Sequence, residues 1–338
     1  MWHDKLSILN IGDLELSSPL ILSPMAGISD LQFRMLNRQF GCELAFAEMI
    51  SARALTYRNS NTMKMLLQHP ADRPLGIQLL GNDPEVMIRA LDILRDYNFD
   101  VLDFNAACPV SKVTTRGEGS ALMKEPVKIF EILKTLVRNC EKPVTVKIRA
   151  GWDESSLNAR DTALYAQDAG VRAVFIHGRT RAQGYSGTVD YGEIRKVKEA
   201  LTIPVIASGD AFSGELIKKL FDETGCDGVA IARGAFGNPW IFRQAEHYLK
   251  YGTLPARPSI SELVDAIITH LNLSVEADGD EMGTVKFRKF FAWYVRGLHD
   301  TRNIRNEAFR ATSRQEMTAF IDQLHSKQYR PGFAEFKR

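Results

Sequence analysis

The sequence predicts an α/β fold, a (β/α)8 TIM barrel with a C-terminal all-helical bundle domain. Over roughly the first 250 residues, short β-rich runs alternate with longer segments of helical periodicity. The runs begin 24, 31, 26, 43, 29, 32 and 23 residues apart, which suits strand–helix–strand crossovers. Beyond residue 258 the pattern is helical throughout. These observations together favour a barrel followed by helices.

Eight runs are expected to be strands, and several are apolar on both faces, as buried parallel strands are. Pro84 suits the first turn of one intervening helix, where Val86, Ala90 and Leu94 repeat at helical spacing. Eight such units in about 235 residues match a closed barrel, and their regularity favours closure over a doubly wound open sheet. The expected strands are Leu20–Met25, Leu44–Met49, Leu75–Leu80, Val101–Ala106, Val144–Arg149, Ala173–Gly178, Val205–Asp210 and Gly228–Gly234.

The segment Thr253–Pro258 breaks this rhythm and reads as a linker. Three helical segments follow it: Glu262–Ala277 with Ser261 as a plausible N-cap, Val285–Leu298, and Arg305–His325. We therefore expect a barrel domain over residues 1–255 and a helical domain over residues 256–338.

The net charge of +2 conceals an uneven distribution. Residues 286–338 hold 12 Lys and Arg against 5 Asp and Glu, so the rest of the chain is slightly acidic. This excess fits either a solvated helical face or a surface that binds a polyanion. A basic helical addition to an enzyme-like barrel favours a polyanionic substrate.

Composition excludes several classes of protein. With 45% hydrophobic residues the chain is neither disordered nor fibrous, and no apolar run is long enough for a membrane span. Met1–Asp13 has no signal-peptide core. The 4 cysteines form no C-x-x-C pair, which argues against a structural metal site and for a reducing compartment. We expect a cytoplasmic protein without a metal.

Polar residues cluster at the ends of the expected strands, where the active sites of barrels lie. Gly209, Arg233 and Gly234 occupy the place where barrels commonly hold a phosphate, although ordinary turn glycines and a surface arginine would look the same. Lys147 interrupts an apolar strand and needs an anionic partner, either a reduced flavin or a carboxylate of Glu48 or Asp103. His177 is either a core histidine or a functional group at its strand end.

Cys108 differs from the other cysteines because it follows a strand end, next to Pro109 and a glycine-containing loop that could move over the site. An unperturbed thiol, with a pKa of roughly 8.5, is mostly protonated near neutral pH. Cys108 is therefore a better candidate for a proton donor than for a nucleophile.

The motifs resemble the tRNA-dihydrouridine synthase family, and within it most resemble the B-type bacterial group. The most specific match is Asp103-Phe104-Asn105-Ala106-Ala107-Cys108-Pro109-Val110-Ser111-Lys112-Val113, followed by Gly117-Glu118-Gly119-Ser120-Ala121-Leu122. Supporting matches are Pro24–Gly27, Gln78–Gly81, Lys147–Arg149, His177–Thr180, Gly237–Trp240 and the basic-aromatic run Arg288–Tyr294. The resemblance covers essentially the whole chain.

The resemblance implies an FMN enzyme that uses NADPH as a transient reductant to reduce the C5–C6 double bond of uridine in tRNA. Cys108 would donate a proton to C5, and Asn105 would hold the uracil edge. The residues implied for FMN are Pro24, Met25, Ala26, Gln78, Lys147, His177, Ser208, Gly209, Asp210, Ala232 and Arg233. Those implied for RNA are Arg179, Lys286, Arg288, Lys289, Arg302 and Arg305.

The sequence departs from the family pattern at Ser208, where asparagine is usual, at Ala106-Ala107 before the cysteine, and at Phe290, often a histidine. The Ser208 change would weaken one flavin contact. Two other functions stay open: an FMN enzyme acting on a free pyrimidine, like dihydroorotate dehydrogenases, and a non-catalytic RNA-binding barrel. The sequence also leaves open which uridine is modified, which tRNAs are accepted and whether prior tRNA modifications are needed. It does not decide between NADPH and NADH. The oligomeric state is open as well, and a monomer is compatible with the sequence.

Overall fold

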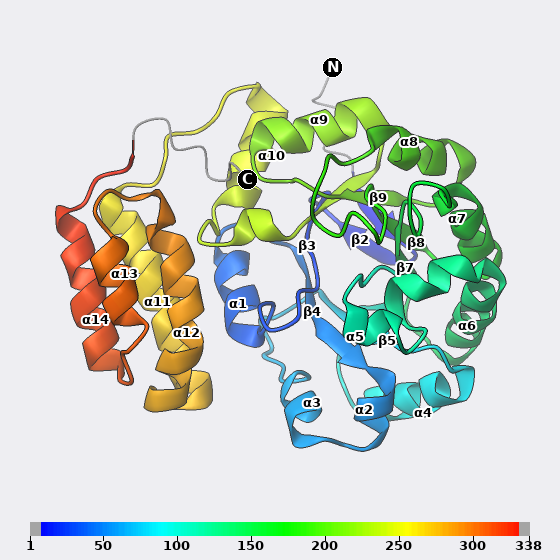
Figure 1. Cartoon of the computed structure of the whole chain (residues 1–338), viewed down its shortest axis with the longest axis horizontal. Coiled ribbons are helices and arrows are strands. Elements are labelled where there is room, and N and C mark those ends of the chain that lie inside the picture. The colour runs from blue at the N-terminus through cyan, green and yellow to red at the C-terminus, as the bar shows by residue number, and fades with distance from the viewer. Residues whose placement is uncertain (1–7, 331–338) are drawn as a thin grey trace.

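Eight parallel strands close into a barrel in the computed structural model, which describes residues 8–330 (Figure 1). The strand order is β10-β3-β4-β5-β6-β7-β8-β9, so the last strand pairs with the first. This confirms the predicted closed barrel. The strands are β3 (Leu20–Leu22), β4 (Leu44–Ser51), β5 (Leu75–Leu80), β6 (Val101–Asn105), β7 (Val144–Arg149), β8 (Ala173–His177), β9 (Val205–Ser208) and β10 (Gly228–Ile231).

Three strands end at least two residues earlier than predicted, each for a local reason. β3 ends two residues before Pro24, and Met25 accepts hydrogen bonds from the N–H groups of Ile28 and Ser29 in a tight turn. β9 ends at Ser208 because Gly209 and Asp210 have positive φ angles of 116° and 52°. Ala232 leaves the extended region after β10, with ψ of −98°. The polar residues at these ends therefore lie on loops.

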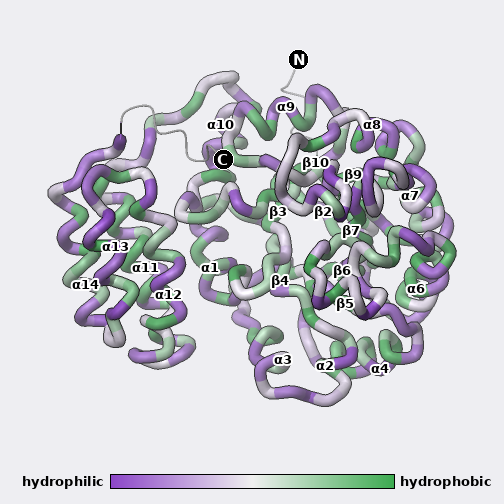
Figure 2. Tube along the Cα trace, in the orientation of Figure 1, coloured by the Kyte–Doolittle hydropathy of each residue, from purple (hydrophilic) through white to green (hydrophobic). Residues whose placement is uncertain are grey.

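Helices surround the barrel, and Figure 2 shows hydrophobic and hydrophilic residues interleaved along them. Asp83 caps the helix that begins at Pro84, which confirms that predicted start. The elements are α1 (Leu31–Gln39), α2 (Ala52–Thr56), α3 (Ser60–Lys64), α4 (Pro84–Leu94), α5 (Ser111–Thr114), η2 (Gly119–Lys124), α6 (Pro126–Asn139), α7 (Ala159–Asp168), α8 (Tyr191–Ala200), α9 (Gly214–Thr224), η3 (Arg233–Ala235) and α10 (Ile241–Tyr251).

An antiparallel hairpin that the sequence did not predict precedes the barrel. It consists of β1 (Leu9–Ile11) and β2 (Leu14–Leu16), joined at Gly12 with φ of +64°. Leu9, Ile11 and Leu16 belong to one buried cluster with barrel residues such as Phe46 and Phe175. The hairpin thus packs into the barrel core. Residues 1–7 of the segment Met1–Asp13 lie outside the described residues, as do residues 331–338 of the basic C-terminal segment.

The C-terminal part is helical, as predicted, and stands side by side with α1 (Figure 1). Residues 253–259 form neither helix nor strand, as a linker should. The elements are α11 (Ile260–Asp278), α12 (Asp280–Tyr294), η4 (Val295–Gly297), α13 (Arg302–Ala308), α14 (Arg314–Asp322) and η5 (Gln323–Ser326).

Two sequence expectations for these helices are wrong. The N-cap of α11 is Ser259, not Ser261, because Ser259 and Glu262 form a reciprocal capping box. The segment Arg305–His325 is two helices, because the chain leaves the helix after Ala308 and Ser313 caps a new one at Arg314. The apolar spacing alone concealed this break.

Aromatic residues join α1 to the C-terminal helices. Phe33 of α1 stacks on Phe290 of α12 with ring centroids 5.6 Å apart, and His270 of α11 lies 4.4 Å from Phe290. His270 is fully buried and its Nδ1 lies 3.0 Å from the hydroxyl of Tyr294, while its Nε2 has no hydrogen-bond partner within residues 8–330. Burial, with a smaller contribution from Lys289, lowers the pKa of His270 to about 3, so the imidazole is neutral.

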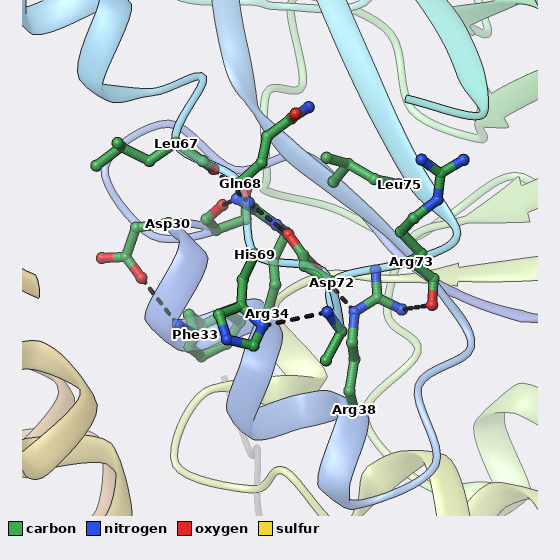
Figure 3. Close-up of polar contacts among 12 residues, drawn as sticks. Asp30, Phe33, Arg34, Arg38, Leu67, Gln68, His69, Asp72, Arg73 and Leu75 are labelled. Carbon is green, nitrogen blue, oxygen red and sulfur yellow. Dashed lines mark hydrogen bonds and ion pairs between the residues drawn. The ribbon is translucent and has the colours of Figure 1, made fainter. Parts of the chain in front are cut away.

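A buried ion-pair network fixes the other side of α1 (Figure 3). The carboxylate of Asp72 accepts hydrogen bonds from Nε of Arg34 at 2.9 Å and of Arg38 at 2.7 Å. Arg34 also donates to the carbonyl of Ser29, at 2.8 Å, in the loop after β3. Asp72 and Arg34 are each 1% exposed. The network therefore ties α1 to the segment before β5 and to the loop after β3.

Replacing Asp72 by asparagine leaves two buried or nearly buried guanidinium groups without their counter-charge. We expect Asp72→Asn to lower the free energy of unfolding by about 3 kcal/mol, as for other broken buried pairs, measured by urea denaturation. Asp222→Asn removes a partly exposed pair with Lys218 in α9 and should cost less than about 0.5 kcal/mol. Equal costs for the two variants would contradict the structural importance assigned to Asp72.

The buried neutral His270 predicts a dependence of stability on pH. Because its folded pKa lies below that of an unfolded histidine, the unfolded chain binds more protons, and stability falls as pH falls through about 6.5. His270→Phe should remove this component. From pH 7 to pH 5 the wild type should lose roughly 2 kcal/mol more than the variant, measured by urea denaturation at each pH. Parallel pH profiles would show that His270 is not held neutral.

Candidate active site

A cavity of about 440 Å³ opens at the C-terminal ends of the barrel strands. Every residue predicted from the sequence to bind the cofactor lines it, and so do Cys108 and Asn105. Arg179 and the basic residues of the C-terminal helices are not among its lining residues. Closure of the barrel thus brings side chains from all eight strand ends to one cavity of the size that small ligands occupy.

The floor of the cavity is a hydrogen-bonded polar network. Gln78 donates to Asp103 at 2.7 Å and accepts from Nδ2 of Asn105 at 2.7 Å, and Thr145 donates to Asp103 at 2.6 Å. Burial raises the pKa of Asp103 to about 6 in spite of these hydrogen bonds. These hydrogen bonds fix the orientation of the side-chain amide groups of Gln78 and Asn105.

Lys147 stands beside this network with its charge only partly compensated. Burial lowers its pKa to about 8, opposed by the nearby charge of Asp103. Among the described residues, no carboxylate lies within 4.0 Å of the Lys147 ammonium group, so neither Glu48 nor Asp103, the alternatives to a flavin partner, forms an ion pair with it. The hydroxyl of Ser23, which also lines the cavity, is buried and has no hydrogen-bond partner in the described part of the chain. Both groups suit a polar ligand.

Asp210 holds two arginines at the ends of β8, β9 and β10. Its carboxylate contacts Nη2 of Arg179 at 2.6 Å and Nη2 of Arg233 at 3.2 Å. Arg179 is fully buried and also donates to the carbonyl groups of Ser186 and Gly187. This position favours a role for Arg179 in fixing Asp210 and the loop after β8, in place of the predicted contact with RNA.

The glycines of this region have packing reasons for their identity. A Cβ on Gly209 would lie 2.9 Å from the His177 ring, and one on Gly234 would lie 2.1 Å from the carbonyl oxygen of Ala211.

Burial, and then the charges of Arg149, Lys147, Arg179 and Arg233, hold the pKa of His177 well below its usual range. A neutral imidazole therefore faces the cavity, able to donate one hydrogen bond and accept another.

The loop that carries Cys108 is fixed from several sides. Oδ1 of Asn105 accepts from the N–H groups of Ala107 at 3.0 Å and Cys108 at 2.8 Å. The carbonyl of Cys108 accepts from the hydroxyl of Ser120 at 2.8 Å. Burial raises the pKa of the Cys108 thiol above its ordinary value, so the thiol is protonated at neutral pH. The arrangement presents a positioned acid at the cavity wall.

Sequence reasoning missed several cavity residues, of which Arg149 and Tyr185 are the most informative. Arg149 is buried and donates to the carbonyl groups of Ala107 at 2.7 Å and of Thr180 and Gly184 at 2.9 Å. The ring of Tyr185 lies 5.8 Å from the guanidinium of Arg149 and 5.1 Å from that of Arg233. The alternation along β7 is the signal that could have identified Arg149, because Arg149 lies two residues after Lys147 and so on the same face. Nothing in the loop sequence indicates Tyr185. Other cavity residues that the sequence analysis did not assign include Ser23, Phe212 and Phe236.

The residues of the C-terminal helices that were predicted to bind RNA divide into two groups by the contacts of their side chains. Lys286 and Arg302 are exposed and Arg305 is half-buried, with Lys286 also paired with Asp278. Arg288 donates to the carbonyl of Ala311 at 2.7 Å, and Lys289 donates to the carbonyl of Gly27 in the loop after β3.

Residues 8–330 contain no group of three or more His, Cys, Asp or Glu arranged to hold a metal ion. No helix in that range is long and apolar enough to span a membrane.

Comparison with solved structures supports the fold. An old yellow enzyme homologue from Zymomonas mobilis superimposes with a TM-score of 0.54 over 77% of this chain and 96% of that chain, at 11% identity. At this identity the match concerns the barrel fold alone.

Comparison of sequences is more specific. The family model of dihydrouridine synthases matches residues 21–329. The chain is 35% identical over 328 residues to a tRNA-dihydrouridine synthase B of Pseudomonas aeruginosa, covering 97% of this chain and 98% of that protein. A probable tRNA-dihydrouridine synthase of Rickettsia conorii is 38% identical over 300 residues, covering 88% and 90%. These matches span the barrel and the C-terminal helices alike, and the chain therefore belongs to the dihydrouridine synthase family.

Proposed function

We propose that this protein is a tRNA-dihydrouridine synthase of the B type, which reduces the C5–C6 double bond of uridine in tRNA with NADPH and bound FMN. The observation that carries the proposal is the single cavity that unites a protonated thiol, an underpaired lysine and polar side chains from all the barrel strand ends, in a chain of this family. The cytoplasm, where tRNA is processed, is the expected location.

The cavity residues fit FMN in size and in chemistry. The volume of about 440 Å³ suits a small ligand. Among the described residues, the Ser23 hydroxyl has no hydrogen-bond partner and the Lys147 ammonium group forms no ion pair. Arg233 and the loops 208–210 and 232–234 would hold the phosphate, and Lys147, Gln78 and the loop Pro24–Ala26 would hold the ring system. When bound, FMN would supply the hydride that it takes from NADPH.

The chain's own residues account for the proton. The thiol of Cys108 is protonated at neutral pH because burial raises its pKa, and its backbone is fixed by Asn105 and Ser120. It can therefore deliver a proton to C5 of a uracil placed in the cavity. The base must leave its stack in the tRNA to enter, as in other base-modifying enzymes. Arg149 and Asn105 keep the Cys108 loop in place for this step.

We propose separate roles for the two parts of the chain. Residues 1–255 would form the catalytic barrel and residues 256–338 the part that binds tRNA. Support comes from the excess of basic residues after position 285 and from the exposure of Lys286 and Arg302. Contacts of these side chains with phosphates would make binding salt-dependent.

The direct test incubates the FMN-loaded protein with NADPH and an unmodified tRNA transcript, and measures dihydrouridine by mass spectrometry of the digested RNA. We expect a mass increase of about 2 Da on specific uridines, since reduction adds two hydrogens. Turnover of free uracil or dihydroorotate without tRNA would contradict the proposal, as would a purified protein that binds no flavin.

Replacing Cys108 removes the proposed acid and leaves the rest of the cavity intact. Cys108→Ala should keep the yellow flavin colour and NADPH oxidation, and dihydrouridine formation should fall by about 10²–10⁴-fold, as for other lost general acids. Cys140→Ala, at a half-buried cysteine outside the cavity, is the matched control and should behave as wild type. If Cys108→Ala loses FMN, the cysteine is structural; if it still forms dihydrouridine at full rate, another group is the acid.

A further inference from the structure

Helix α12 contacts two loops of the cavity through side chains four residues apart. Lys289 donates from its ammonium group to the carbonyl of Gly27, in the loop after β3. Trp293, one helical turn later, stacks on Phe236 after β10, with centroids 4.2 Å apart and ring planes 11° apart. Residues at this spacing share one face of a helix. One face of a C-terminal helix thus meets both sides of the seam where the barrel closes.

Both contacted loops belong to the wall of the cavity. Pro24, Met25, Ala26 and Ile28, which flank Gly27, line it, and so does Phe236 itself. Gly27 has φ of +71° and is held at both ends, because its N–H donates to the carboxylate of Glu48 and its carbonyl accepts from Lys289. The conformation of this loop therefore depends on a side chain from outside the barrel.

The ammonium group of Lys289 interacts with other groups of the protein. Burial raises the pKa of Asp30, the N-cap of α1, to about 6; among the smaller contributions, the charge of Lys289 lowers this pKa and that of Glu48 raises it. The ammonium group therefore donates to the carbonyl oxygen of Gly27 and lies near enough to Asp30 to interact with its charge. Such surroundings suit a fixed internal contact better than a mobile phosphate contact.

The second contact is equally close-packed. Gly237 follows Phe236 with φ of +68°, and a Cβ there would lie 2.6 Å from the backbone carbonyl group of Trp293 and 2.8 Å from the nitrogen of Tyr294. The ring of Trp293 also packs against the ring of Phe290 in an edge-to-face arrangement, with centroids 5.5 Å apart. Phe290 in turn stacks on Phe33 of α1. A displacement of α12 must therefore move the loop after β10.

We propose that Lys289 and Trp293 are positioning residues that brace the FMN cavity from the tRNA-binding part, so that flavin affinity depends on the docking of α12. The proposal rests on the assignment of the cavity to FMN. By thermodynamic linkage, flavin binding must in turn stabilise the docked helix. It gives Lys289 a different role from the RNA contact that the sequence implied.

The test measures the dissociation constant of FMN for the full-length apoprotein, by titration with FMN and its fluorescence, without RNA. Lys289→Met and Trp293→Leu should each weaken FMN binding by about tenfold, a size usual for coupling between contacting groups. Lys289→Arg and Trp293→Phe keep a donor and a ring and should restore most of the affinity. Glu281→Gln, at an exposed position on the same helix, should change it less than about twofold.

The outcomes separate this inference from the proposed function. FMN binding that is the same in wild type, Lys289→Met and Trp293→Leu would overturn the brace and leave the proposed function standing. Weaker tRNA binding by Lys289→Met, with unchanged FMN affinity, would assign Lys289 to RNA and overturn the brace as well. A wild type that binds no FMN would overturn both. Circular dichroism of each apoprotein confirms that a changed constant does not reflect unfolding.

Discussion

Pairing of the last barrel strand with the first is the constraint on which the candidate site depends. Ile231 of β10 pairs with Leu22 of β3, and the N–H of Ser23 donates to the carbonyl of Ile231. This contact brings the loop after β3 beside Arg233, although the two are about 200 residues apart in the sequence. Because all eight strands run in parallel, the other polar strand ends meet the same rim. Without closure these side chains would lie along an open edge.

Collecting polar groups in a barrel mouth costs free energy unless each group has a partner. Most of them do: Asp103 bonds to Gln78 and Thr145, Asn105 to the Cys108 loop, and Asp210 to two arginines. Within residues 8–330, the Lys147 ammonium group forms no ion pair and the Ser23 hydroxyl has no hydrogen-bond partner. Hydrogen bonds within the protein thus fix most of the site. The ammonium group of Lys147 and the hydroxyl of Ser23 are left to interact with a bound ligand.

The barrel was predictable from the regular spacing of its strands along the chain, since the strands are short, largely apolar runs with polar residues at or near their ends. The same logic predicted the cavity residues from Pro24 to Arg233. Features without a long period were missed: the hairpin of two three-residue strands, the break between Ala308 and Ser313, and the loop residue Tyr185. Lys289 looked like a surface cation because its contact, Gly27, lies far away in sequence. Such long-range contacts have no local signal.

The central claim is that this cavity reduces uridine within tRNA. Mass mapping of dihydrouridine in tRNA from cells lacking this protein tests it most directly. The account predicts that dihydrouridine disappears from a defined uridine position, and returns when the wild-type chain is supplied but not when the Cys108→Ala chain is. An unchanged dihydrouridine content at every mapped position in the deleted cells would contradict it.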